Sequence, residues 1–416
     1  MKILLKKVTL IDPKGDFHLK EVDIYISNGH IEKIGTALSV SADKVVAKEK
    51  LMVSVGWFDS SVCFGEPGYE ERETLENGLK TASCSGFTEI GLEPETQPHT
   101  ATQSAVVHLK NYASNYPTIL HPIASFTQGQ AGKHLTEFYD LKCHGAIAFG
   151  DYLTPIENPE LLKTALLYAQ GLDGLILSTP YSSALNGMAG VHEGEISTQL
   201  GLRGSPVLNE TLQIQRDLHL LSYTGGKLHI PCISSAESVA LIREGKKKGL
   251  KVTCSVALAN ICYTDKMLQG YSTHAKLQPP LREEKDCEAL KAGLLDGTID
   301  MITSHHQPLN SEVKQLEFEY AKSGTTGLEA MFGVLNTLFP LDKTIQFLSR
   351  GRSHFGLKEP KIIEGEQANL TLFTAHTSST VKKEQLHSKN HNCIFIGHET
   401  RGEVIGTILG NNHWIA

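Results

Sequence analysis

Polar residues that could do chemistry follow several short apolar runs of the sequence. In the stretch GWFDSSVCFGEPG, residues 56–68, Asp59, Ser61 and Cys63 are spaced two apart, so in an extended strand their side chains share one face. A hydrolytic metal centre needs several histidine or carboxylate ligands and an open position for water. The usual set of such ligands is not visible. The further candidates at the ends of apolar runs are Asp151, Cys232, His305 and His306.

Eight apolar runs carry these residues, and helix-like patterns such as ESVALIREGKKKG lie between them. Eight strand–helix alternations predict a (β/α)₈ barrel, in which the chemistry lies at the C-terminal ends of the strands. A doubly wound sheet is the alternative, but the glycine-rich fingerprint after the first strand is missing. The runs are LMVSVGWFDSSVCF, FTEIGLEP, TILHPIASFT, GAIAFGD, GLILSTP, KLHIPCISS, KVTCSVALA and IDMITSHH.

The two ends of the chain have a different pattern from the middle. Apolar and polar residues alternate over short runs such as KILLKKVTLID near the start and ANLTLFTAHT near the end, and SNGH is a hairpin-turn signal. We therefore expect one small β-sandwich composed of residues 1–53 and 363–416. The barrel is expected to occupy residues 54–362.

Length and composition narrow the class of protein. A chain of 416 residues exceeds one ordinary core, and its net charge of −7 argues against a general nucleic-acid or anionic-membrane role. There is no apolar run of about 18 residues, and the N-terminus lacks a signal-peptide cleavage pattern. The eight cysteines are scattered with no CxxC pair, which is typical of reduced thiols. We expect a cytoplasmic protein.

Several motifs together resemble the dihydroorotases of the amidohydrolase superfamily. They include VGWFDSSVCFGEPGYEERET, NGMAGVHEGEISTQLGL, KLQPPLREEKDCEALKAGLLDGTIDMITSHHQP and GTTGLEA, and the resemblance runs nearly from end to end. It implies the barrel with its composite β-domain. It also implies the closing and opening of a cyclic amide in pyrimidine biosynthesis, with zinc, a metal-bound hydroxide and an aspartate after strand eight.

The resemblance also shows what is replaced at the first strands. That family has the pattern Asp-x-His-x-His-x-Arg-x-Pro-Gly in strand one, and Asp59 matches its first position. Ser61 and Cys63 stand where the two metal-binding histidines belong. Gly65 stands at the arginine that would clamp the substrate carboxylate. The acidic ligand of strand four corresponds to Asp151.

Later family positions are altered in the same way. Glu95 falls on a substrate-binding asparagine, where its charge is expected to repel an anionic substrate. Thr179 and Cys232 fall on the histidine ligands of strands five and six. Ser304 falls on the catalytic aspartate, beside a retained His305. The resemblance therefore predicts a homologue with no bound cofactor, no metal site and no dihydroorotase activity.

The role expected for such a chain follows from the resemblance alone. Inactive homologues in some bacteria assemble with aspartate carbamoyltransferase, so we expect a structural partner of that enzyme, and a homo-oligomer. The alternative is an active cyclic-amide hydrolase with a rebuilt zinc site made from Asp59, Cys63, Asp151, Cys232 and His305. A third class is a metal-free sensor that uses the old pocket.

Some residues have a plainer interpretation beside the functional one. Cys63 and Cys232 are either a thiolate metal site or, as we favour, two buried small thiols. His305 is either a base or a side chain left over in the mouth of the barrel. Lys276 and Arg282, in the stretch KLQPPLR, either bind an anion or hold a loop.

Overall fold

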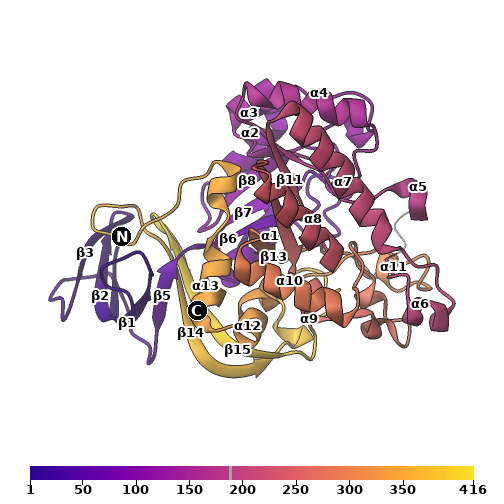
Figure 1. The fold of residues 1–416 in the computed structure, drawn as a ribbon. Helices are drawn as coiled ribbons and strands as arrows, with labels where there is room; N and C mark the ends of the chain where they lie inside the picture. The colour runs from indigo at the N-terminus through magenta and orange to yellow at the C-terminus, as the bar shows by residue number, and fades with distance from the viewer. Residues whose placement is uncertain (187–189) are drawn as a thin grey trace.

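The computed structural model describes residues 1–186 and 190–416. Gly187–Ala189, which belong to the motif NGMAGVHEGE, lie outside the described residues. The described chain forms a barrel of parallel strands and a separate mixed sheet that lies beside it (Figure 1). The predicted architecture is confirmed.

The eight predicted runs form the eight parallel strands of the barrel, in chain order. The first and last strands meet through a bridge between Val62 and His306, and the amide of Cys63 donates to the carbonyl of His306 at 2.8 Å. The strands are β6 Trp57–Val62, β7 Phe87–Leu92, β8 Ile119–Ala124, β9 Ala148–Phe149, β10 Leu175–Leu177, β11 Lys227–Ile230, β12 Val252–Ala257 and β13 Met301–Thr303.

Helices surround this barrel (Figure 1). Several begin at a residue whose side chain accepts an amide hydrogen of the first turn; at α8, for example, Ser235 accepts from Ser238. The longer helices are α1 Leu75–Cys84, α2 Gln103–Ala113, α4 Pro159–Gln170, α7 Val207–Thr224, α8 Ala236–Lys247, α10 Glu284–Asp296, α12 Leu328–Leu338 and α13 Leu341–Ser349. Shorter ones are α3 Phe138–His144, α5 Ser183–Asn186, α6 Glu195–Leu200, α9 Leu258–Cys262 and α11 Ser311–Lys314.

Both chain ends build one eight-stranded mixed sheet in the order β16-β15-β14-β5-β1-β2-β3, with β4 paired to β1. The predicted SNGH hairpin joins β2 to β3, and Asn28 and Gly29 have the positive φ values, 49° and 78°, that such a tight turn requires. The strands are β1 Lys2–Ile11, β2 Glu21–Ser27, β3 His30–Gly35, β4 Lys44–Val46, β5 Met52–Val55, β14 Asn369–Thr380, β15 Glu399–Leu409 and β16 Asn412–Ile415.

The run LMVSVGWFDSSVCF is divided between the two sheets. Met52–Val55 belongs to the terminal sheet and Trp57–Val62 to the barrel, with Gly56 between them. A Cβ at Gly56 would lie 2.0 Å from side-chain atoms of Thr88 and Asn369, so the chain crosses between the sheets where only glycine fits. An unbroken apolar run carries no signal for this division, because both strands are buried.

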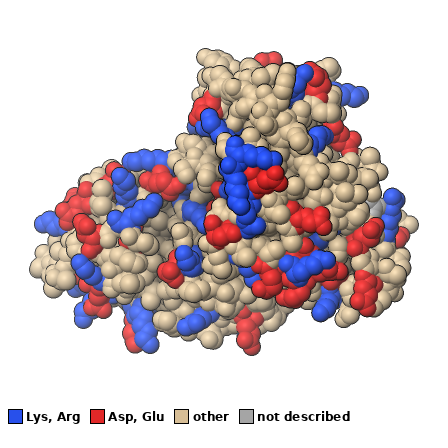
Figure 2. All heavy atoms as spheres, in the orientation of Figure 1, with Lys and Arg blue, Asp and Glu red and all other residues tan. Residues whose placement is uncertain are grey.

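The face of the molecule in Figure 2 carries Lys, Arg, Asp and Glu side chains interspersed, without a large patch of one sign. Among the described helices, none is both long and apolar enough to cross a membrane.

Candidate functional site

A pocket lies at the C-terminal ends of the barrel strands. This is the end of the fold at which barrel enzymes place their chemistry. Apolar side chains form part of its wall. Its other lining residues are Ser61, Glu93, Tyr152, Thr179, Tyr181, Cys232, Gln278 and His305.

Asp59 points into the barrel but has no free carboxylate oxygen to offer. Its Oδ1 accepts from the amide of Ser61 at 3.0 Å and from the hydroxyl of Thr303, and its Oδ2 accepts from the amide of Ser304 at 2.9 Å. Burial raises the pKa of Asp59 against the lowering effect of these hydrogen bonds. The carboxylate thus fastens β6 to the end of β13.

Asp151 is occupied in a similar way after β9. Its Oδ1 accepts from the amides of Phe126 at 2.8 Å and Thr127 at 3.1 Å, and its Oδ2 accepts from the hydroxyl of Thr127. Burial raises the pKa of Asp151 as well. Asp151 is not among the residues that line the pocket, so this carboxylate joins two loops of the barrel.

Three positions that align with family metal ligands carry a hydrogen-bonded hydroxyl or a buried thiol. The hydroxyl of Thr179 donates to the carbonyl of Tyr152. Cys63 and Cys232 are buried free thiols, and burial raises the pKa of both. In the chain without a metal, burial therefore favours the neutral thiol form of both residues.

His305 lines the pocket, whereas Ser304 does not. Burial lowers the pKa of His305 to about 4, so the imidazole is neutral at pH 7. His306 is fully buried and its Nδ1 accepts from the amide of Gly327 at 3.2 Å. His306 therefore holds a loop and does not face the pocket.

Glu95 does not present a free charge, which corrects the expectation that it repels an anionic substrate. Arg72 donates to its Oε1 at 3.1 Å, and Gln307 donates to its Oε2 at 3.2 Å. The thiol of Cys63 also donates to Oε2, at 3.5 Å. Sequence reasoning missed Arg72, because the pair joins residues that only the fold brings together.

Gly65 is required by the local backbone. Its φ is 120°, and a Cβ there would lie 2.7 Å from the carbonyl oxygen of Tyr69. A side chain at this position would meet both backbone strain and a steric clash. The loop therefore has no place for the arginine that the resemblance led us to look for.

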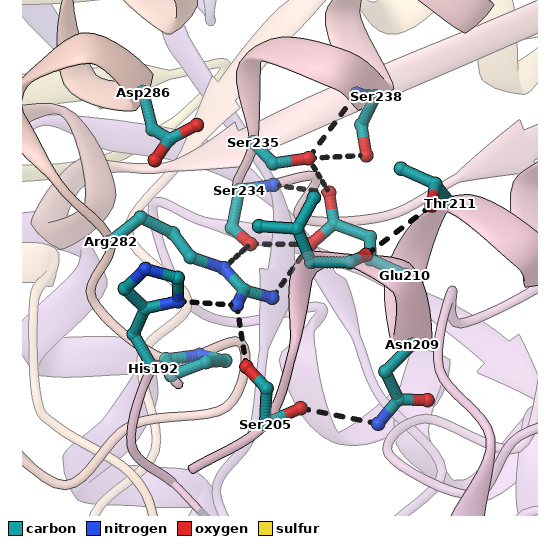
Figure 3. A network of polar contacts seen from close by, with 12 residues as sticks. His192, Ser205, Asn209, Glu210, Thr211, Ser234, Ser235, Ser238, Arg282 and Asp286 are labelled. Atoms are coloured by element: carbon teal, nitrogen blue, oxygen red, sulfur yellow. Dashed lines mark hydrogen bonds and ion pairs between the residues drawn. The ribbon is translucent and has the colours of Figure 1, made fainter. Parts of the chain in front are cut away.

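Lys276 and Arg282 are both turned to internal partners. Lys276 Nζ donates to the carbonyls of Phe318 and Glu319 at 2.8 and 2.9 Å. Figure 3 shows Arg282 in a buried network, where it donates to Ser234 Oγ at 3.0 Å and lies 3.6 Å from Glu210 Oε2. Neither residue lines the pocket. Their contacts are those of residues that hold loops.

Residues from several helices, strands and loops contribute hydrogen bonds to the network in Figure 3. Arg282 also donates to the carbonyl of Ser205 at 2.8 Å and to His192 Nδ1 at 3.1 Å. Glu210, on α7, accepts from the amide of Ser234 at 2.9 Å. The network thus ties the segment before α10 to α7 and to the end of β11.

Glu93 is the pocket residue that sequence reasoning missed. It follows β7 directly and is 4% exposed, and its Oε1 accepts from the hydroxyl of Ser61 at 2.8 Å. Burial raises the pKa of Glu93 to about 8, although the bond from Ser61 opposes the shift. A signal did exist, because Glu89, Gly91 and Glu93 share the strand face that points into the barrel.

The described residues do not form a ligand set that fits zinc. In residues 1–186 and 190–416, no group of three or more His, Cys, Asp or Glu side chains is placed to hold a metal ion. The carboxylates of Asp59 and Asp151 already accept several hydrogen bonds each. Zinc needs deprotonated, available nitrogen, sulfur or carboxylate donors.

Comparisons with known proteins agree with this architecture. The L-hydantoinase (dihydropyrimidinase) from Arthrobacter aurescens superimposes with a TM-score of 0.84 at 20% identity, covering 99% of this chain and 95% of the other. A D-hydantoinase (dihydropyrimidinase) from Thermus sp. gives 0.82 at 16% identity, covering 99% of this chain and 95% of the other. At this identity the likeness defines the fold, which is the barrel of the amidohydrolase type with its terminal β-domain.

Sequence relatives define the family more closely. Residues 49–238 match the family model described as dihydro-orotase-like. The dihydroorotase of Pelotomaculum thermopropionicum is 34% identical over 417 residues, covering 99% of this chain and 97% of its own. That of Syntrophus aciditrophicus is 36% identical over 422 residues, covering 98% of both. The chain belongs to the dihydroorotase family.

Proposed function

We propose that this chain is a non-catalytic dihydroorotase homologue of pyrimidine biosynthesis that acts as a structural partner of aspartate carbamoyltransferase. One observation carries the first half of this proposal. The side chains at the family's metal positions are bonded to the protein itself or are protonated thiols, and no group of metal-ligating side chains is found in the described residues.

The loss of activity follows from what a metal site supplies. A bound metal lowers the pKa of water so that hydroxide forms at neutral pH. The family's general base is also replaced, since Ser304 stands at that position. A positioned base contributes typically about 10²–10⁴-fold. Without either group, the remaining hydroxyls and neutral imidazole have no means to activate water.

The substrate clamp is missing as well. Gly65 has a backbone conformation and a neighbour, the Tyr69 carbonyl, that leave no room for a side chain. Arg72, in the loop after β6, and Arg282, before α10, are each paired with a buried or half-buried glutamate. A carboxylate substrate would therefore find no bidentate partner of the kind that arginine provides.

The partner role rests on the resemblance to inactive homologues, and homo-oligomer formation is proposed with it. Mixing the purified chain with the aspartate carbamoyltransferase of the same organism should give a complex of defined mass in analytical ultracentrifugation. The chain alone should sediment as an oligomer. Independent sedimentation of the two proteins would contradict the partner role without bearing on catalysis.

The catalytic half is tested by metal analysis and assay together. The purified full-length chain should contain less than stoichiometric zinc and should not form dihydroorotate from carbamoyl aspartate, even after incubation with zinc. The dihydroorotase of Pelotomaculum thermopropionicum serves as the positive control under the same conditions. Turnover that disappears with a chelator would overturn the proposal.

A second candidate function is an active cyclic-amide hydrolase with a rebuilt site, and the elevated pKa of Glu93 favours it. Carboxyl groups with strongly raised pKa values in pockets are candidates for general acids. This function would require a rebuilt zinc site made from Asp59, Cys63, Asp151, Cys232 and His305. Stoichiometric zinc that is lost in Cys63→Ser would support it.

A further inference from the structure

We propose that Lys276 and Lys314 form a proton-sensitive clasp, which holds together the loops that follow β12 and β13 and opens on acidification. The clasp consists of residues 264–276 of the first loop and 311–324 of the second. It goes beyond the proposed function, because it concerns neither catalysis nor the carbamoyltransferase. The clasp can therefore fail its test while the proposed function holds, and the reverse.

Lys314, at the end of α11, lies in a cage of three carbonyl oxygens. Its Nζ donates to Thr273 of the first loop at 2.6 Å, and to Lys322 and Gly324 of its own loop at 2.9 and 3.0 Å. The residue is 2% exposed. All three N–H donors of the ammonium group thus have a partner. Carbonyl groups carry no net charge, however, so the cage does not neutralise the ammonium charge that it surrounds.

Lys276 reaches from the first loop to the second. Its Nζ donates to the carbonyls of Phe318 and Glu319 at 2.8 and 2.9 Å, and the residue is 5% exposed. Its surroundings favour a positive charge more than those of Lys314 do. The Nζ atom lies 5.2 Å from the centre of the Phe318 ring, and the carboxylate of Glu319 also favours the charged form. Lys276 therefore keeps its proton more readily than Lys314.

The clasp holds more positive charge than its surroundings neutralise. Burial and the charge of Lys276 lower the pKa of Lys314 to about 7. Burial also lowers the pKa of Lys276, and the pKa of His274 is lowered by burial and by the charges of Lys314 and Lys383. Among the described residues, Glu319 is the one carboxylate whose charge acts on either lysine. The groups that face the pair are thus His274 from the first loop, Glu319 from the second and Lys383 from the segment after β14.

Protons must therefore favour the open arrangement of the loops. When the loops separate, water reaches Lys314 and its pKa returns to the ordinary value of 10.5. Between pH 7 and 10.5 the open form then binds a proton that the closed form lacks, so a falling pH stabilises the open form. Below pH 7 Lys314 is protonated in both forms, and its effect is constant.

A third loop packs on the clasp. A Cβ at Gly190 would lie 2.7 Å from Cγ of Lys276 and 3.0 Å from Oγ of Ser323. The φ of Gly190 is 66°, so both the space and the backbone at this position require glycine. The segment that begins at Gly190 should therefore loosen together with the two loops when the clasp opens.

Hydrogen exchange of the full-length chain between pH 7 and pH 9 tests the clasp. The amide of Gly324 donates to the carbonyl of Lys276 at 3.0 Å, so its protection reports closure. After correction for the intrinsic effect of pH on exchange, the opening constant of both loops should rise about tenfold per pH unit as the pH falls. The change from pH 9 to pH 7 is then roughly 100-fold. Strands β1 and β2 of the terminal sheet should not follow it.

Two variants on the same loop assign the response. Lys314→Met removes the titrating group, so the opening constant of the loops should no longer depend on pH between 7 and 9. The protection itself falls as well, because three carbonyls lose their donor, and the readout is therefore its dependence on pH. Lys322→Met is the matched control, because Lys322 is exposed and contributes only its carbonyl to the cage. This control should keep the roughly 100-fold change.

A direct titration does not depend on the stability of the variants. In wild-type protein labelled with carbon-13 at the lysine Cε atoms, one lysine should titrate near pH 7, and its signal should be absent in Lys314→Met. Lys276→Met should raise the midpoint of this lysine, because it removes a neighbouring positive charge.

Several results would overturn the clasp. One is an opening constant of the loops that is unchanged between pH 9 and pH 7, or that rises toward pH 9. A midpoint of Lys314 near 10.5 is another, because a closed form with an ordinary lysine pKa gives the loops no response to protons. A response to pH that persists in Lys314→Met would assign the opening to a different group.

Discussion

Two glutamates, one within β7 and one directly after it, have opposite surroundings. Glu89 lies in β7 near the N-terminal end of the barrel, and Glu93 follows the same strand at the mouth. Glu89 has a partner for both oxygens: Arg352 and Asn369 donate to Oε1 at 2.9 Å each, and His121 donates to Oε2 at 2.9 Å. Glu93 has one partner, Ser61, and one free oxygen.

The difference appears in their acidity. Burial alone would raise the pKa of Glu89, but the bond from His121 and the charge of Arg352 outweigh it and lower the pKa to about 2. The pKa of Glu93 is raised to about 8 by burial. The two glutamates are equally buried, but Glu89 is an anion at the bottom of the barrel and Glu93 is a protonated carboxylic acid at its mouth. The bottom is built for stability, as in barrels generally, and the mouth retains unsatisfied groups.

The largest effect is expected from removing the partner of the bottom glutamate. Arg352→Met should lower the free energy of unfolding by about 3–5 kcal/mol, because it leaves the Glu89 charge buried without its cation. Urea denaturation at pH 7 measures this. Lys80→Met, which breaks an exposed pair with Glu76, should change it by less than about 1 kcal/mol. Similar losses in the two variants would contradict the assignment of Glu89 as a buried anion.

Acid should remove the stabilisation that Glu89 provides. Its pKa is about 2 in the folded chain against an ordinary value of 4.5, so its contribution is present above pH 4.5 and is lost as the pH falls toward 2. The shift corresponds to about 3 kcal/mol. We expect the stability difference between wild type and Glu89→Gln to shrink by about that amount between pH 5 and pH 2. A constant difference would show that Glu89 is not held ionised.

The mouth glutamate should behave in the opposite way. Because its folded pKa is about 8, the carboxyl of Glu93 costs no stability below pH 4.5. As the pH rises from 4.5 to 8, it increasingly lowers the free energy of unfolding. Glu93→Gln should therefore be more stable than wild type by about 2–3 kcal/mol at pH 7, with no advantage at pH 4. A loss of stability at pH 7 would mean that the carboxyl has a structural partner.

Much of the fold could be predicted from the sequence, because parallel strands buried on both faces appear as short apolar runs. The eight runs from LMVSVGWFDSSVCF to IDMITSHH became β6 to β13 in order. The β-domain from both ends was predicted for a related reason, the alternating pattern of its strands. The division at Gly56 was not, since it depends on Thr88 and Asn369, which are distant in the sequence.

The site was predicted only where the residues themselves carry the information. Ser61, Cys232 and His305 were expected at the mouth and do line the pocket. The partners of Glu95 and Arg282 were not foreseen, because both pairs join different loops and helices. Glu93 was not predicted. Its unusual acidity comes from burial, which the sequence does not report.

The smallest effect separates two neighbouring serines of β6. Ser60 and Ser61 are both 4% exposed, but only Ser61 donates to Glu93, and the hydroxyl of Ser60 has no partner in the described structure. Ser61→Ala should lower the free energy of unfolding by about 1 kcal/mol and raise the pKa of Glu93 further, since the lost bond favours the anion. Ser60→Ala should be neutral or slightly stabilising, because it removes an unsatisfied hydroxyl. Urea denaturation and carbon-13 NMR titration of the Glu93 carboxyl measure the two effects. Equal responses of the two variants would show that the Ser61 bond does not set the state of the pocket, and the contrast between the ends of β7 would then rest on burial alone.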